Sequence, residues 1–443
     1  MVASQVQTFM QQIVAAPDDD APRLIYADWL SEHGDPLGEL IQLQCRQAAE
    51  PDDANRRAMK IVENKLMKMY EAVWLEHLIQ AMPPQPVVDP PKFWFERGFV
   101  ATAKLSLAYA PYIAALQQRA PLLRSVTFTP SRTANMTTVP VPSVDGVFDD
   151  PVYESFATLD LNLPGGGNAI AREVARATSL RNLTSLGISA SVWGETVSWY
   201  GAPSEQLVLD DAGAIELARS PHLRNVKHLR LASNRITVKG LRAIGQAAWR
   251  LESLDLSDNV LGDEGFITAL EGPATAGLVV LGLDRAHVAN DELVRLVKTT
   301  VLTQLRELSL ESNGIGAKGI VALCKAFALP SLRHLRLERN SVCDAGAHAI
   351  AECAGLAQLT SFEAGHNLIG KKGGTAIALS PHLAKLEKLT LNEPRWKPEM
   401  TDVFANSPTL ANTRIYLKGK LVARKPDKKH KPTKPVAAKR SKT

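Results

Sequence analysis

Few features of this sequence indicate export, membrane insertion or metal binding. Its cysteines form no C-x-x-C pair and stand at Cys45, Cys324, Cys343 and Cys353. That spacing favours free thiols in a reducing compartment over a disulfide framework or a zinc site. No apolar run approaches the ~18 residues that span a bilayer, and residues 1–16 lack the basic and apolar regions of a signal peptide. We therefore expect a cytoplasmic chain without a metal site or membrane contact.

The motifs of common enzyme sites are also missing. A glycine-rich stretch at 165–168 is not followed by Gly-Lys-Ser/Thr and is not part of G-x-G-x-x-G, so a glycine-rich turn explains it better than a phosphate-binding loop. Neither G-x-S-x-G nor H-E-x-x-H occurs, and the 10 histidines are scattered. An active site assembled from distant residues stays an alternative, but we expect no enzyme activity, no catalytic residues and no cofactor.

The acidic segment "PDDDAPRLIYADWL" near the N-terminus invites comparison with a calcium loop. A calcium loop that starts at Asp18 would need an oxygen ligand at its fifth position and glycine at its sixth, where this chain has Pro22 and Arg23. The acidic residues and Pro22 instead suit the first turn of a helix, which Gly34 would end. The next residues, Asp35 and Pro36, predict the start of a second helix in the same way.

The body of the sequence is a repeat. The template L-x-x-L-x-L-x-x-N-x-L starts at 27-residue intervals at Leu251, Leu278, Leu305, Leu332, Leu359 and Leu386. Another copy starts at Val226, and weaker copies start at Leu123, Phe156 and Leu183. The longer interval from Leu183 to Val226 predicts an insertion near 194–210. We expect about ten coils, with a terminal strand after Leu410.

Each coil combines a short strand, a turn and a helix. The template leucines should point into the core, with a parallel sheet on the inside of a curve and helices outside. An asparagine recurs where each strand ends, and its amide can satisfy backbone groups that no helix or sheet reaches. These residues are Asn234, Asn259, Asn313, Asn340 and Asn367, while Ala286 and Pro394 replace asparagine in two copies. The predicted fold class is therefore α/β, a solenoid with a small α-helical module before it.

These cores, with turns such as "NGIGAKG" from Asn313, resemble leucine-rich repeats of the ribonuclease-inhibitor type, strongly over 226–396 and weakly over 123–193. The stretch "YADWLSEHGDPLGELIQLQ" resembles the repeat-companion domain that precedes repeats in many bacterial proteins. That resemblance implies association with repeats and no known chemistry. We expect a companion module at 1–48, a helical linker and cap at 49–98, the leucine-rich-repeat solenoid at 99–417 and a disordered basic tail at 418–443.

Charge is divided unevenly along the chain. The net charge is +5, but residues 418–443 hold 11 Lys/Arg and one acid, so the remainder carries an excess of acid. A tail of this composition cannot bury enough apolar surface to fold alone. It favours weak contact with nucleic acid or another polyanion. The alternatives are a solubilising end and a tail that folds back onto the acidic body.

The outward positions of the strands form the candidate partner-binding surface. Asp284, Glu311 and Glu338 should occupy adjacent strands, where like charges repel. Either interleaved arginines neutralise them as a solvated charge lattice, or the acids dock a basic partner. The candidate residues are Arg230, Asp255, Asp258, Asp284, Arg285, Glu307, Glu311, Arg336, Glu338, Arg339 and Glu363, with Trp199 and Tyr200 as a possible loop site in the insertion.

A non-catalytic protein–protein interaction scaffold is the function that this sequence favours. We expect a monomer that binds an unidentified protein through the concave or rim face of its repeats. Ribonuclease-inhibitor-type repeats also occur in activators of small GTPases, so a regulator of a GTPase-like enzyme is one alternative. A nucleic-acid binder that acts through its tail is another. Fold resemblance alone cannot choose among these.

Overall fold

The structure is a computed structural model that describes residues 2–51, 53–82, 89–130, 144–163, 166–190, 208–262, 265–299, 301–325 and 329–422. It divides into two compact units. The first comprises Met1–His287 with Thr299–Val301, and the second comprises Val288–Lys298 with Leu302–Thr443. The division after His287 is next to Ala286, where the asparagine of the repeat is missing. The predicted tryptophan–tyrosine loop site, the insertion and most of the tail lie outside the described residues.

The first unit begins with four helices: α1 (Val2–Ala15), α2 (Ala21–Glu32), α3 (Leu37–Ala49) and α4 (Asp53–Ile79). Carboxylates start two of them, because Asp19 Oδ1 accepts the N–H of Ala21 and Asp35 Oδ1 accepts the N–H of Leu37, each at 2.9 Å. Asp20 forms an ion pair with Arg97 Nε at 3.3 Å. The acidic segment thus starts a helix and pairs with a later arginine. Buried packing of α1–α3 centres on Ile13, Tyr26, Ala27, Leu30, Ile41 and Cys45.

The described strands of the first unit follow chain order: β1 (Lys92–Glu96), β2 (Phe99–Ser106), β3 (Ser125–Thr129), β4 (Thr158–Asn162), β5 (Ser185–Ser189), β6 (His228–Arg230), β7 (Ser253–Asp255) and β8 (Val280–Gly282). From β2 to β8 the pairing is parallel. The hairpin of β1 and β2 is antiparallel. The expected helical linker and N-terminal cap up to residue 98 thus ends in a strand at 92–96, which a tight turn at Gly98 pairs with β2.

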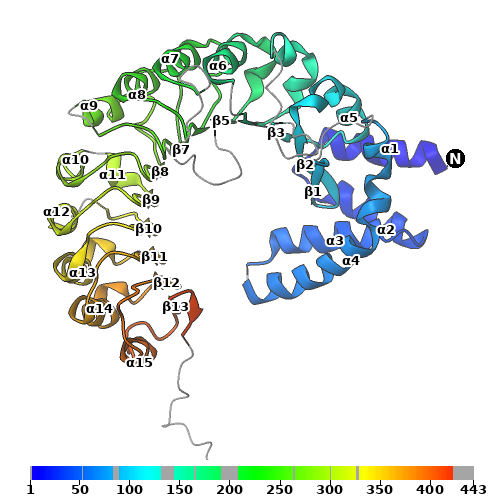
Figure 1. Cartoon of the computed structure of the whole chain (residues 1–443). Helices are drawn as coiled ribbons and strands as arrows, with labels where there is room; N and C mark the ends of the chain where they lie inside the picture. The colour runs from blue at the N-terminus through cyan, green and yellow to red at the C-terminus, as the bar shows by residue number, and fades with distance from the viewer. Residues whose placement is uncertain are drawn as a thin grey trace, which may run out of the picture. The chain divides into compact units, whose positions relative to one another are not determined.

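Helices follow the strands of the first unit and form a separate row beside them (Figure 1). They are α5 (Ile113–Arg119), α6 (Gly167–Arg176), α7 (Asp211–Arg219), α8 (Val238–Gly245) and α9 (Phe266–Leu270), with short 3-10 turns η1 (Leu107–Tyr112), η2 (Val147–Asp149), η3 (Pro151–Ser155) and η4 (Thr178–Asn182). Template leucines fill the space between the two rows; Leu254 and Leu256, for example, are completely buried. The sequence periodicity therefore produces one continuous apolar layer in this unit.

The second unit repeats this arrangement. Its strands are β9 (Glu307–Ser309), β10 (His334–Arg336), β11 (Ser361–Glu363), β12 (Lys388–Leu391), β13 (Arg414–Leu417) and β14 (Lys420–Leu421). Its helices are α10 (Asn290–Leu296), α12 (Ala317–Lys325), α13 (Cys343–Ala351), α14 (Lys371–Ala378) and α15 (Glu399–Ala405), with η6 (Ala354–Leu356) and η7 (Pro381–Leu383); α11 (Val301–Gln304) straddles the division. The ten template copies contain β3–β12. The predicted fold class, an α/β solenoid after a helical module, is confirmed.

The end of the second unit differs from the expectation. The expected tail begins at residue 418, but β14 pairs antiparallel with β13 across a turn at Gly419. Lys418 Nζ donates to the carbonyl oxygens of Pro394 at 3.1 Å and Trp396 at 2.7 Å. These bonds tie the hairpin to the preceding coil, so the folded region extends at least to Val422.

Buried asparagines join neighbouring coils through their side chains. Asn259 Nδ2 donates to Leu231 O at 2.8 Å and Leu256 O at 3.0 Å, and its Oδ1 accepts the N–H of Ile236 at 2.8 Å. Asn340 makes the same kinds of bond in the second unit. The predicted role of this position is confirmed: the amide satisfies backbone groups where the strand ends.

A carboxylate takes over this function at the last copy. Glu393 is 3% exposed, and its Oε1 accepts the N–H of Asn367 at 2.6 Å. Pro394 occupies the template position, and its neighbour supplies the acceptor instead. The pKa of Glu393 is raised above its ordinary value because burial is the largest effect. Backbone hydrogen bonds from Asn367, Ile369 and Leu368 act in the opposite direction and offset part of the rise.

Glu393 should therefore make stability depend on pH. A folded pKa above the ordinary value of 4.5 means that the folded state binds more protons, so this group's contribution falls as pH rises from about 4.5 through the folded pKa. We expect Glu393→Gln, which keeps an acceptor oxygen, to gain in melting temperature relative to the wild type as pH rises over that window. A difference that stays constant from pH 4.5 to 8 would contradict this assignment.

Candidate functional site

The outward positions of the first unit form one row across its strands. Asp160, Gly187, Arg230, Asp255 and Gly282 are register partners in that order. Arg230 Nη2 donates to Asp160 Oδ1 across the intervening strand β5. A side chain at Gly187 would collide with that carboxylate. Because Gly187 of β5 has no side chain, Arg230 and Asp160 can form an ion pair although their strands are not neighbours.

Other candidate residues of the first unit lie at the ends of the strands or just after them. Arg285 donates through Nε and Nη2 to the two oxygens of Asp258, at 2.5 Å and 2.8 Å. Asp255 Oδ1 accepts the N–H of Ser257 at 3.0 Å. The N–H of Asp284 donates to Ser257 Oγ at 3.1 Å. Arg285 therefore interleaves with the acids as a charge lattice requires.

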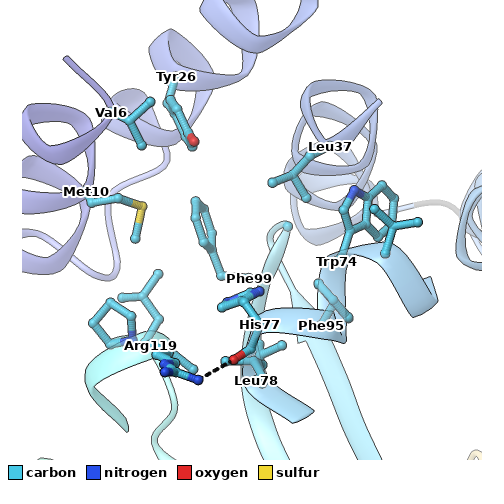
Figure 2. Close-up of a pocket in the computed structure, with 16 residues that line it drawn as sticks. Val6, Met10, Tyr26, Leu37, Trp74, His77, Leu78, Phe95, Phe99 and Arg119 are labelled. Atoms are coloured by element: carbon cyan, nitrogen blue, oxygen red, sulfur yellow. Dashed lines mark hydrogen bonds between the residues drawn. The ribbon is translucent and has the colours of Figure 1, made fainter. Parts of the chain in front are cut away.

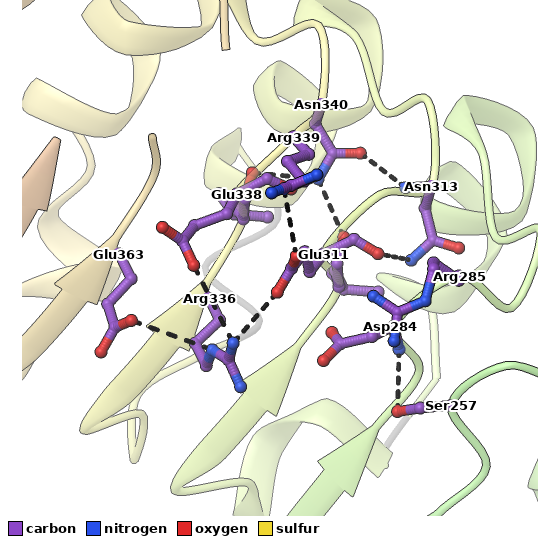
Figure 3. A network of polar contacts seen from close by, with 12 residues as sticks. Ser257, Asp284, Arg285, Glu311, Asn313, Arg336, Glu338, Arg339, Asn340 and Glu363 are labelled. Atoms are coloured by element: carbon purple, nitrogen blue, oxygen red, sulfur yellow. Dashed lines mark hydrogen bonds and ion pairs between the residues drawn. The ribbon is translucent and has the colours of Figure 1, made fainter. Parts of the chain in front are cut away.

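Arg336 is the centre of the polar network in the second unit (Figure 3). It lies 3.0 Å from a carboxylate oxygen of Glu311, 3.9 Å from Glu338 and 4.0 Å from Glu363. Arg339 adds a second cation, 3.6 Å from Glu311. Lys388 pairs with Glu363 at 2.5 Å. We call Glu311, Arg336, Glu338, Arg339, Glu363 and Lys388 the strand-face network.

The basic groups of the strand-face network are the more exposed ones. The glutamate side chains are 15–20% exposed, whereas Arg336 is 45%, Arg339 68% and Lys388 43% exposed. Two acids of the expected strip, Glu311 and Glu338, are thus paired with cations that are more exposed than they are. Burial, with the charges of Glu311 and Glu363, raises the pKa of Glu338. Glu307, by contrast, lies exposed at the start of β9.

Carboxylates hold the guanidinium groups of this surface in place. Guanidinium groups ordered in this way are chemically able to bind carboxylate or carbonyl oxygens. No group of three or more His, Cys, Asp or Glu residues suited to a metal ion occurs among the residues that the structure describes. All four cysteines are free, and three of them are buried.

Sequence reasoning missed two members of these ion pairs. Asp160 holds the same template position as Arg230, so an outward residue could have been expected there. Lys388 stands at another template position, and its long side chain reaches the carboxylate of Glu363. No local signal identifies such a contact, because it depends on the reach of the side chain.

An apolar cavity of about 390 Å³ lies in the first unit (Figure 2). Its aromatic lining comes from Tyr26, Trp74, Phe95 and Phe99. Small-molecule sites combine such a lining with polar groups that orient the ligand. In this cavity the guanidinium group of Arg119 is already bonded within the protein, because its Nη1 donates to His77 O at 2.8 Å. We therefore assign no ligand to this cavity.

The Leucine Rich repeat family model matches residues 222–245, 251–267 and 301–324. These segments overlap the repeat copies whose buried leucines and asparagines are described above. The chain therefore contains leucine-rich repeats in these segments. No curated protein matches it.

Among solved structures, this chain is similar to an internalin (inlF) from Listeria monocytogenes str. 4b F2365. The identity is 13% and the TM-score 0.37, over 68% of this chain and 82% of the internalin. Within the described part of the chain, no helix is both long and apolar enough to cross a membrane.

Proposed function

We propose that this leucine-rich repeat protein is a non-catalytic scaffold that binds a protein partner on the outward face of its strands. The observation that carries the proposal is the strand-face network. Its cations, at β10 and β12, are more exposed than the carboxylates that position them. Arginine is enriched where proteins recognise one another, and prior ordering reduces the entropy lost on binding.

The partner should offer oxygen atoms rather than basic groups. Arg336 and Arg339 present guanidinium edges that match carboxylates. Because the network is internally neutral, with three acids and three bases, long-range steering would be weak and geometry would determine specificity. The four free thiols suit a reducing cytoplasm, and the resemblance of the N-terminal module suits a bacterial source.

The test compares the full chain with the double variant Arg336→Lys/Arg339→Ala. Lysine keeps a positive charge among the three glutamates but removes the guanidinium fork, so the variant should remain folded. Protein captured from a lysate of the organism of origin would be identified by mass spectrometry, and its affinity measured with purified components. We expect at least a tenfold loss of affinity in the variant, as for truncation at interface hot spots.

The matched control is Lys239→Ala/Arg242→Lys, which changes two exposed cations of helix α8 and, like the strand-face variant, removes one positive charge. It should bind the partner within about twofold of the wild type. Equal affinity of wild type and strand-face variant would reject this surface as the binding site. Equal losses in both variants would mean that net charge, rather than the network, determines binding.

A further inference from the structure

Another cavity, with both apolar and basic residues in its lining, lies in the last coils of the second unit. Its volume is about 610 Å³, and its lining includes His366, Lys371, Arg395, Lys397 and the buried Glu393. Volumes of this size are typical of ligand sites. We call this the basic cavity.

The cations of the basic cavity differ from those of the strand-face network in their lack of ion-pair partners within the described part of the chain. Lys371, Arg395 and Lys397 are exposed, and none has an ion-pair partner among the residues that the structure describes. Two carboxylates also line the cavity: Glu399 is exposed, and Glu393 accepts a backbone N–H. Three unpaired cations around one cavity repel each other, so an anion bound there would be stabilised.

The basic cavity is continuous in sequence and contact with the most basic part of the chain. Residues 366–422 hold nine Lys/Arg and four Asp/Glu, and residues 423–443 hold nine Lys/Arg and one Asp. Lys418 binds the carbonyl oxygens of Pro394 and Trp396, in the segment that lines the cavity. The hairpin that leads to the basic terminus is therefore attached to the cavity wall.

We propose that the basic cavity binds the phosphate backbone of a nucleic acid. Lysine and arginine without carboxylate partners are the groups that replace counterions along such a backbone. A folded set of cations next to a long basic sequence suits a polymer of phosphates better than a single small anion. The contacts would be independent of base sequence, because the cavity offers charge and no exposed aromatic ring for stacking.

The test uses the full chain and the triple variant Lys371→Gln/Arg395→Gln/Lys397→Gln. Fluorescence anisotropy with a labelled DNA duplex would give the affinity between about 50 and 200 mM salt. We expect the variant to bind at least about tenfold more weakly at ~100 mM salt and to lose about 2 to 3 from the slope of log affinity against log salt. Both effects should be the same for unrelated DNA sequences.

A matched control removes the same charge elsewhere. Arg57→Gln/Lys65→Gln/Lys68→Gln neutralises three exposed cations on α4 and should change affinity by less than about twofold. The proposal is overturned if the wild type does not bind DNA, if the cavity variant keeps the wild-type slope, or if both variants lose affinity equally. Binding of the protein partner should be unaffected by the cavity variant, so this proposal and the strand-face proposal can fail separately.

Discussion

Replacing Asn259 by alanine is expected to destabilise the first unit by about 3 kcal/mol. The side chain is 1% exposed. Its amide donates to Leu231 O, Leu256 O and Ser257 O, and its oxygen accepts the N–H of Ile236. Alanine would leave Leu256 O and the N–H of Ile236 without partners, at roughly 1–3 kcal/mol for each group that water cannot reach. The oxygens of Leu231 and Ser257 would keep bonds from Asn234 Nδ2 and the N–H of Ser233.

Two measurements check this expectation. Urea denaturation gives the loss in free energy of unfolding, and hydrogen exchange reports the amide of Ile236, whose partner is Asn259 Oδ1. That amide should lose protection more than amides in the second unit, because coils contact mainly their neighbours. Asn225→Ala removes an exposed amide that donates to Arg181 O, and it should cost no more than about 0.5 kcal/mol. Equal stability of the two variants would contradict the stabilising role of the buried asparagines.

Gly98→Ala is expected to destabilise the same unit by about 3–4 kcal/mol. Gly98 has φ +84°, and a Cβ atom there would lie 2.9 Å from Ile41 Cα on α3. The left-handed backbone costs alanine about 1–2 kcal/mol, and overpacking against a helix backbone costs about 1–3 kcal/mol. The N–H of Gly98 also donates to the buried Gln44 Oε1 at 2.7 Å, so any shift of the turn loosens that bond.

Gly34→Ala separates the two costs. Gly34 has φ +72°, and a Cβ atom there would meet no neighbouring atom within 4 Å, so this variant carries the backbone cost alone, about 1–2 kcal/mol. The difference between the variants in chemical denaturation should be about 2 kcal/mol, the cost of overpacking. Limited proteolysis should cleave α3 faster in Gly98→Ala than in Gly34→Ala. Equal behaviour would mean that contact between this turn and α3 contributes nothing to stability.

Much of the fold is encoded locally in the repeat. The 27-residue template gives each coil its own strand, turn and helix, and the leucines and asparagines act within the coil or on the next one. Short-range signals also encode the ends of α2 and α3, because Asp19, Asp35 and the adjacent prolines act on the next turn of chain. Such features follow from residue type and spacing alone.

The details of the candidate sites depend on contacts that spacing does not encode. Arg230 meets Asp160 only because the strand between them carries Gly187, and Glu393 replaces an asparagine from a neighbouring position. The template positions identified which charged residues lie on the strand face. They did not predict that the arginines would be more exposed than the glutamates. The sequence by itself determined the solenoid, since periodic burial needs only local pattern. The tertiary structure alone decided which charges are paired, because ion pairing depends on strand register and side-chain reach across coils.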